Sequence, residues 1–133
     1  MTTVHCTYAG DLHCQACHGP SGAQLETDAP VDNQGRGAAF SPTDLVGTAL
    51  VSCILTVMGI VARRHGLALE GASARVEKTM SGSGVRRIAG LEVWLQLPAA
   101  LEPDQRALLI HAGETCPVKV SIENGIPITL HWN

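Results

Sequence analysis

The longest apolar run in the chain lies at residues 45–62, which include no charged side chain. Signals at both ends predict a helix over residues 41–66. Ser41 is a favourable N-cap, a proline follows it, and Asp44 completes a Ser-x-x-Asp pattern typical of a capping box. At the other end, Gly66 follows two arginines and a histidine and can adopt the left-handed conformation that ends many helices.

This uncharged run of 18 residues also meets the length criterion for a membrane-spanning helix. Two glycines, two threonines and a serine dilute its hydrophobicity, and no second run of this kind is present. A helix that is apolar on all sides usually lies inside a protein. We therefore interpret it as a buried core helix and predict no membrane association.

The residues before this helix alternate between apolar and polar types with the period of a β-strand. They predict an antiparallel meander of three strands, at residues 3–9, 11–18 and 23–28, with a turn at Ala9-Gly10-Asp11. Residues 29–40 form a turn-rich loop that carries Arg36 and leads into the helix. Loops of this kind often carry functional residues.

After the helix, the pattern predicts two further strands, two short helices and a last strand. These elements are expected at residues 72–80 and 86–97, from Pro103 to about Gly113, from Pro117 with Cys116 as its cap, and at 127–132. The fold class is therefore α+β with antiparallel sheets. At 133 residues we expect a single domain, made of an N-terminal meander and loop (1–40), a central helix (41–66) and a C-terminal α+β part (67–133).

Charge and composition narrow the possible partners. The chain has 9 basic and 12 acidic residues, and the basic ones form no stripe interleaved with aromatic side chains, so we predict no nucleic-acid partner. Aromatic residues make up only 3%, so the core must be aliphatic. An apolar helix in so small a chain favours association with a second copy, since one layer of sheet cannot cover it.

The N-terminal residues and the cysteines indicate a cellular compartment. No basic region followed by an apolar run stands at the N-terminus, so we expect no export signal and a cytoplasmic protein. Five cysteines in that compartment are expected to be free thiols rather than a set of disulfides.

Two of these cysteines are candidates for chemistry. Cys116 is predicted at a helix N-terminus, where backbone amides and the helix dipole lower a thiol pKa. Cys53 lies in mid-helix among apolar neighbours, which raise the pKa unless a cation or donor is supplied. The alternative for each residue is a buried cysteine that acts only as a small hydrophobic side chain.

The sequence Cys14-Gln15-Ala16-Cys17-His18 matches the attachment motif of c-type haem. On a strand, however, the two cysteines would point to opposite faces and could not converge on one cofactor. A zinc site would need paired ligands at a turn, and the candidates include no second Cys-x-x-Cys: His5, Cys6, Cys14, Cys17 and His18. We predict no cofactor and no metal.

The segment Ser41-Pro42-Thr43-Asp44-Leu45 leading to Cys53, with Thr115-Cys116-Pro117-Val118 about sixty residues later, resembles the OsmC/Ohr family of thiol-dependent peroxidases. The order of strands and helices over nearly the whole chain is also similar. The resemblance implies an OsmC-like fold, in which antiparallel sheets wrap around the long central helix of an intertwined homodimer. It also implies that Cys53 lies beside Cys116 at the subunit interface.

In that family the cysteine equivalent to Cys53 attacks an organic hydroperoxide to give a sulfenic acid. The second cysteine, here Cys116, resolves it as a disulfide that small dithiols reduce, a sequence that suits the oxidation chemistry of a thiolate with a resolving partner. The resemblance therefore implies a peroxidase that acts in oxidative-stress defence, with an organic hydroperoxide substrate and a dithiol reductant. The alternative is a non-catalytic OsmC-like dimer that serves as a redox sensor or binds an apolar small ligand.

The sequence departs from the peroxidase members at two positions. They carry a glutamate two residues after the residue that opens the helix, where this chain has Thr43, and an arginine in the first hairpin, where it has His13. The nearest substitute arginine is Arg36. The chain is thus more similar to an OsmC-like branch, with Arg36 or His13 as the expected stabiliser of a Cys53 thiolate.

Overall fold

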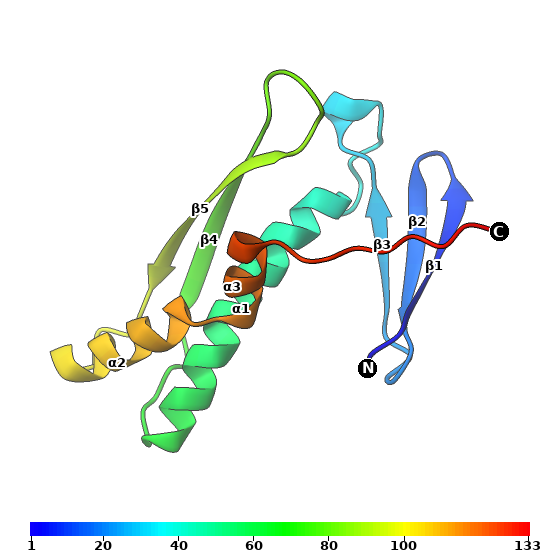
Figure 1. The fold of residues 1–133 in the computed structure, drawn as a ribbon. Helices are drawn as coiled ribbons and strands as arrows, with labels where there is room; N and C mark the ends of the chain where they lie inside the picture. The colour runs from blue at the N-terminus through cyan, green and yellow to red at the C-terminus, as the bar shows by residue number, and fades with distance from the viewer. The chain divides into compact units, whose positions relative to one another are not determined.

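The computed structural model describes residues 1–133, and the chain divides into two compact units, residues 1–46 and 47–133. Three strands and a short 3-10 helix come first, followed by a long helix, two strands and two further helices (Figure 1). This mixed α+β architecture with antiparallel sheets agrees with the predicted fold class. The prediction of one domain stays a prediction.

The first unit contains a three-stranded antiparallel sheet in the order β1-β2-β3. The strands are β1 (Val4–Gly10), β2 (His13–His18) and β3 (Gln24–Asp28), so the predicted meander is confirmed. The first hairpin turns at Asp11 and Leu12, which both have positive φ, 52° and 60°. Two consecutive positive φ values are typical of the tight turns that match the twist of a hairpin. The turn therefore lies slightly later than Ala9-Gly10-Asp11, where the pattern placed it.

The long helix, α1 (Pro42–Arg64), begins as its sequence predicts. The Ser41 N–H donates to Asp44 Oδ2 at 2.9 Å, and the Asp44 N–H donates to Ser41 Oγ at 3.1 Å. This reciprocal pair satisfies backbone and side-chain groups that the first helical turn would otherwise leave open. The predicted capping box is confirmed.

The C-terminal end of α1 is closed by Gly66, whose φ is 65°. The Gly66 N–H donates to the Arg63 carbonyl at 3.3 Å, and the Leu67 N–H donates to the Ala62 carbonyl at 2.8 Å. These two bonds form the Schellman arrangement, which needs a left-handed residue at this position. The helix thus ends where the glycine was expected to end it.

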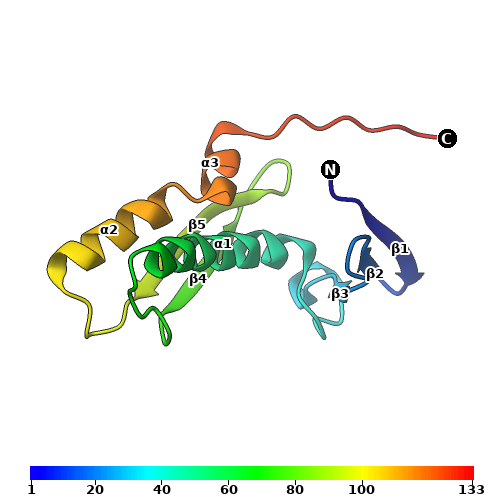
Figure 2. The same cartoon turned by 90° about the horizontal axis from the view of Figure 1, so that it is seen from below.

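The second unit is built on a two-stranded antiparallel sheet, β4 (Ser73–Met80) and β5 (Ile88–Gln96). Helix α1 lies along this sheet (Figure 2), and a Cβ added at Gly47 would be 3.5 Å from a Val76 methyl group. The chain then forms α2 (Pro103–Glu114) and α3 (Pro117–Asn124), as predicted. The 3-10 helix of the first unit, η1 (Val31–Asn33), was not predicted.

Helix α1 supplies most of the core of the second unit. Its buried residues follow one side of the helix: Gly47, Leu50, Ile54, Met58 and Ala62. By length and composition α1 could cross a membrane, but core helices of soluble proteins pass the same test. Only 28% of its most apolar 18-residue stretch is buried within this chain. The helix was expected to be buried on all sides, and the chain itself covers one side only.

The C-terminal residues correct one prediction. The expected strand at 127–132 is absent, and no regular secondary structure follows α3. Every second side chain of this segment is apolar and 63 to 85% exposed: Ile126, Ile128, Leu130 and Trp132. The alternation is that of a strand, but a strand also needs a neighbour for its backbone hydrogen bonds, and no strand of this chain pairs with the segment.

Replacing Gly66 by alanine should lower the free energy of unfolding by about 1 kcal/mol, because a Cβ strains the left-handed backbone. No atom lies within 4 Å of the added carbon, so steric overlap does not contribute. Gly82→Ala is the matched control, since its surroundings are equally open and its φ is not positive. Its effect should stay below about 0.5 kcal/mol in urea titrations. Equal effects of the two changes would contradict this role of Gly66.

Candidate thiol site

The second unit brings together the two cysteines that the sequence singled out. Cys53 lies near the middle of α1 and packs against the buried core cluster, of which Cys116 is a member. Cys116 is fully buried, with 0% of its surface exposed, and it lies close enough to Cys53 to raise the pKa of that thiol. The pair is therefore placed for chemistry that passes between the two sulfur atoms.

The start of α3 determines the surroundings of both sulfurs. Cys116 is the N-cap of this helix, as predicted, and its Sγ accepts the backbone N–H of Lys119 at 3.4 Å. The backbone N–H of Val118 interacts with the Cys53 thiol. Free amides and the dipole at a helix N-terminus favour negative charge, so the first turn of α3 is a donor surface for both thiols.

Burial nevertheless dominates the acidity of Cys53. It raises the pKa of the Cys53 thiol above its ordinary value, and the neighbouring Cys116 thiol raises it further. The Val118 amide lowers this pKa, but by less. The neutral thiol therefore prevails near neutral pH within this chain, and a reactive thiolate would need a further cation or donor.

Lys119 was not expected to belong to this site. Its ammonium group lies 2.7 Å from a Glu123 carboxylate oxygen and 3.2 Å from one of Glu114. Glu123, followed by Glu114, raises the pKa of Lys119, so the ammonium stays charged and engaged with both partners. The i,i+4 spacing of Lys119 and Glu123 was the available sequence signal. Together these contacts hold the turn whose amides face the sulfurs.

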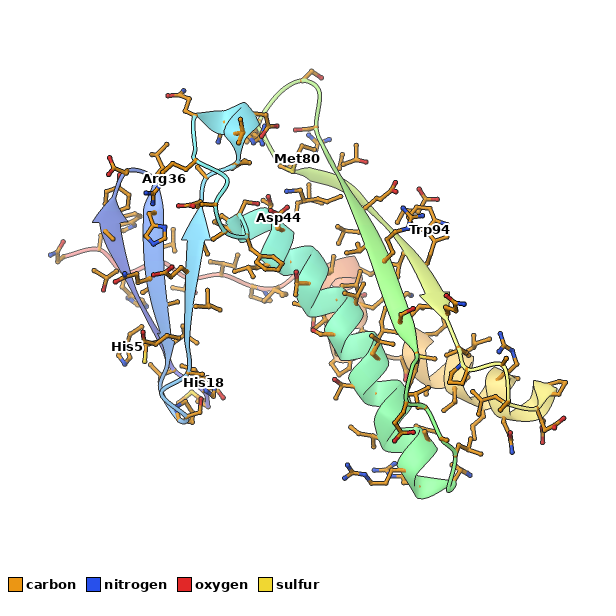
Figure 3. The ribbon with its side chains drawn as sticks, turned by 180° about the vertical axis from the view of Figure 1, so that it is seen from behind. His5, His18, Arg36, Asp44, Met80 and Trp94 are labelled. Atoms are coloured by element: carbon orange, nitrogen blue, oxygen red, sulfur yellow. The ribbon has the colours of Figure 1, made fainter.

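His13 and Arg36, the expected thiolate stabilisers, lie in the first unit and meet at Asp28. The ring nitrogen Nδ1 of His13 is 2.7 Å from Asp28 Oδ1, and Arg36 Nη2 is 3.4 Å from the same oxygen. The guanidinium of Arg36 reaches back from the loop toward the sheet (Figure 3). The structure thus joins these two candidates through a residue that sequence reasoning missed.

Asp28 is the third residue of this cluster and is only 1% exposed. The hydrogen bond from His13 is the largest cause that lowers the pKa of its carboxyl group. Arg36 and the backbone N–H of Ala38 lower that pKa as well, whereas burial alone would raise it. No local pattern marks Asp28, because its partners come from other segments of the chain.

The motif of Cys14, Cys17 and His18 lies on β2, where the strand register places the two cysteines on opposite faces. Cys14 is paired with Tyr8 of β1, and Cys17 is paired with His5. The geometric argument against a shared cofactor at these residues therefore holds. No group of three or more His, Cys, Asp or Glu side chains gathers anywhere in the chain in a way that could hold a metal ion.

Comparison with known proteins identifies the family. A family profile described as OsmC-like protein matches residues 35–131, which include both Cys53 and Cys116. The chain belongs to the OsmC-like family. No curated protein matches it.

Solved structures of this family share the fold. A Psychrobacter arcticus 273-4 protein named for osmotic stress induction and detoxification response is 42% identical, with a TM-score of 0.84 over 91% of this chain and 88% of that one. An organic hydroperoxide resistance protein OsmC from Legionella pneumophila is 20% identical, with a TM-score of 0.68 over 92% and 88% of the two chains. An OsmC-like protein from Mycoplasma pneumoniae is 12% identical, with a TM-score of 0.73 over 92% and 87%. The last two show a common fold.

The pKa of the Asp28 carboxyl should lie below its ordinary value of 3.8 in the folded protein, because His13 and Arg36 favour its charged form. Its contribution to stability is then complete above the unfolded pKa and is lost as the pH falls through the lower folded pKa. The amide proton of Ala38, which donates to Asp28 Oδ2, reports this titration by NMR. The change in the Ala38 amide chemical shift at acidic pH should disappear in Asp28→Asn. A midpoint at or above 3.8 in the wild type would contradict the cluster.

Proposed function

We propose that this protein is a thiol-dependent peroxidase that reduces organic hydroperoxides in the cytoplasm as a defence against oxidative stress. The observation that carries the proposal is the contact between Cys53 and Cys116 at the N-terminus of α3. Membership of a family that includes an organic hydroperoxide resistance protein supports the same reaction class.

The reaction runs in two thiol steps and a reduction. The Cys53 thiolate attacks the terminal oxygen of the hydroperoxide, so that an S–O bond forms, the O–O bond breaks and an alcohol leaves after taking a proton. Cys116 then attacks the sulfenic sulfur, which forms the disulfide and releases water. A small dithiol reduces that disulfide by exchange and is itself oxidised to a cyclic disulfide.

Activation of Cys53 is the demanding part of this scheme, because burial raises the pKa of its thiol. The amide of Val118 supplies one stabilising contact for a thiolate. We assign the remaining stabilisation to Arg36 or His13, the two side chains held at Asp28. A cation beside a thiolate is the usual means of lowering its pKa.

The core residues around the two thiols favour a substrate with an apolar body. Cys116 belongs to a cluster of aliphatic residues that includes Ile54, Met58 and Leu109, and Val118 packs against it. Sites lined mainly by apolar side chains, with few polar groups, bind ligands that can bury hydrocarbon surface. An alkyl or aryl hydroperoxide meets this description better than hydrogen peroxide does.

The wild-type protein with dithiothreitol should consume cumene hydroperoxide, and Cys53→Ser should reduce the rate to that of the buffer, because it removes the nucleophile. Without dithiothreitol, Cys116→Ser should consume one equivalent of hydroperoxide and then stop with an oxidised Cys53. The exposed Cys6 supplies the matched control, Cys6→Ser, which should keep the wild-type rate. A wild type no faster than Cys53→Ser would refute the peroxidase.

A second candidate function is a redox sensor that cycles slowly between dithiol and disulfide, and the raised pKa of Cys53 is the observation in its favour. Intact mass after mild peroxide separates the possibilities. A loss of two hydrogens that requires both Cys53 and Cys116, without fast turnover, supports the sensor. No change in mass would leave only the binding of an apolar ligand.

We further propose that the protein is an intertwined homodimer with its site at the subunit interface. Two features support this: α1 is buried on one side only, and the segment after α3 exposes an apolar residue at every second position. A second copy could cover the helix and give that segment a strand to pair with.

Analytical ultracentrifugation should therefore give about twice the chain mass of 13.9 kDa. Ile128→Asp should shift the population toward monomer, because it places a charge among the apolar side chains that the dimer would bury. Thr129→Asp, one position along, lies on the other side of the alternation and should have a smaller effect. A wild-type monomer at micromolar concentration would contradict the homodimer.

A further inference from the structure

The first unit contains a buried charged group that the peroxidase scheme does not use directly. Asp28 ends β3 and is 1% exposed, and its hydrogen-bond partners are residues other than the two cysteines. A buried carboxylate is costly unless cations and hydrogen-bond donors surround it. The hydrogen-bond donors around Asp28 therefore make its burial possible, and their arrangement indicates its role.

Three donors from two segments converge on this carboxylate. His13 of β2 and Arg36 of the loop both bind Oδ1, at 2.7 and 3.4 Å, and the backbone N–H of Ala38 binds Oδ2 at 3.0 Å. An ionised carboxylate only accepts hydrogen bonds, so Nδ1 of His13 must carry a proton. The other ring nitrogen, Nε2, is left 3.7 Å from the exposed Glu26 carboxylate.

The same aspartate closes the loop that carries Arg36. Its backbone N–H donates to the Phe40 carbonyl at 3.1 Å, and the Gly37 N–H donates to the Ala29 carbonyl at 3.3 Å. Asp28 therefore binds the far side of the loop through both its backbone and its side chain.

The residues on each side of Arg36 fit this closed loop closely. A Cβ at Gly35 would overlap the Ala29 carbonyl, and one at Gly37 would lie 2.8 Å from Val31 Cγ2. The Gly35 N–H also donates to the Pro30 carbonyl at 2.9 Å. The loop thus has a defined backbone path, and Arg36 extends from it with 59% of its side chain exposed.

The geometry points to Asp28 as the positioning residue of the first unit: it fixes which nitrogen of His13 carries the proton, and it holds the loop that presents Arg36. Its consequence for catalysis rests on the proposed function, in which one of these side chains stabilises the Cys53 thiolate. Its local consequences, the tautomer and the closed loop, do not depend on that function.

Asp28→Asn is the informative substitution, with Glu26→Gln as the matched control. An asparagine has one acceptor oxygen and one NH₂ donor, so it cannot accept from His13, Arg36 and Ala38 together. Glu26 also lies near His13, and it accepts a hydrogen bond from Gln15 of the neighbouring strand. The first variant should loosen the loop, and the control should not.

Limited digestion with trypsin measures the loop directly, since the enzyme cleaves after Arg36 when the backbone opens. Cleavage there should be at least about tenfold faster in Asp28→Asn and unchanged in Glu26→Gln. Cleavage after Arg87, in the turn between β4 and β5, is the internal control and should keep its rate in both variants. Equal cleavage after Arg36 in the wild type and Asp28→Asn would overturn the loop assignment.

Nitrogen NMR of the wild-type ring measures the tautomer, and it remains decisive if Asp28→Asn fails to fold. Neutral His13 should carry its proton on Nδ1 in the wild type and in Glu26→Gln, whereas Asp28→Asn should lose that preference. A wild-type ring protonated on Nε2 would overturn the assignment. A purely structural role for Asp28 would not single out this nitrogen.

The catalytic consequence is measured separately. If the proposed function holds, Asp28→Asn should lower kcat/KM for cumene hydroperoxide about tenfold, while Glu26→Gln stays within about twofold. A wild type without peroxidase activity would refute the proposed function and leave the tautomer and loop results to stand. If Asp28→Asn kept the wild-type rate, the catalytic consequence of the positioning role would be refuted, and the tautomer and loop measurements would stand by themselves.

Discussion

The packing of the α2–α3 junction against the middle of α1 is the contact on which the candidate thiol site depends. Gly113, near the end of α2, lies so close to α1 that an added Cβ would be 3.2 Å from Ile54 and 3.4 Å from the sulfur of Met58. Three residues later the chain reaches Cys116, which caps α3 and is fully buried. A larger residue at position 113 would crowd both of these side chains, so the close packing of the junction on α1 depends on this glycine. The meeting of the two thiols is therefore a consequence of helix packing.

The same packing has two opposing effects on the reactivity of the thiols. Burial among aliphatic side chains brings the sulfurs together, but it also raises the pKa of Cys53 and so works against a thiolate. The first turn of α3 counteracts this in part, because its amides donate to both sulfurs. The ion pairs of Lys119 with Glu114 and Glu123 lie on that turn, so they stabilise the donors without placing an ammonium on either sulfur.

Local signals predicted much of this structure, and non-local contacts account for the rest. The ends of α1 and the Cys116 cap depend on residues within a few positions of one another, and these were predicted. The pairing of Cys53 with Cys116 came from family resemblance, since no local pattern reports a contact across about sixty residues. The strand expected at 127–132 was wrong because alternation describes a strand but does not supply its neighbour. Asp28 was missed because its role arises only where β2, β3 and the following loop meet.

The cluster at Asp28 bears on the main difference between this sequence and the peroxidases that it resembles. Those proteins combine a hairpin arginine with a glutamate at the start of the long helix, where this chain has His13 and Thr43. Here Arg36 finds a carboxylate in Asp28 instead, and His13 shares the same oxygen. An exposed ion pair holds an arginine weakly, whereas a buried carboxylate that also accepts a backbone amide has a fixed position. Thr43 in place of the usual glutamate therefore does not leave this chain without a positioned arginine, because Asp28 of the sheet holds Arg36.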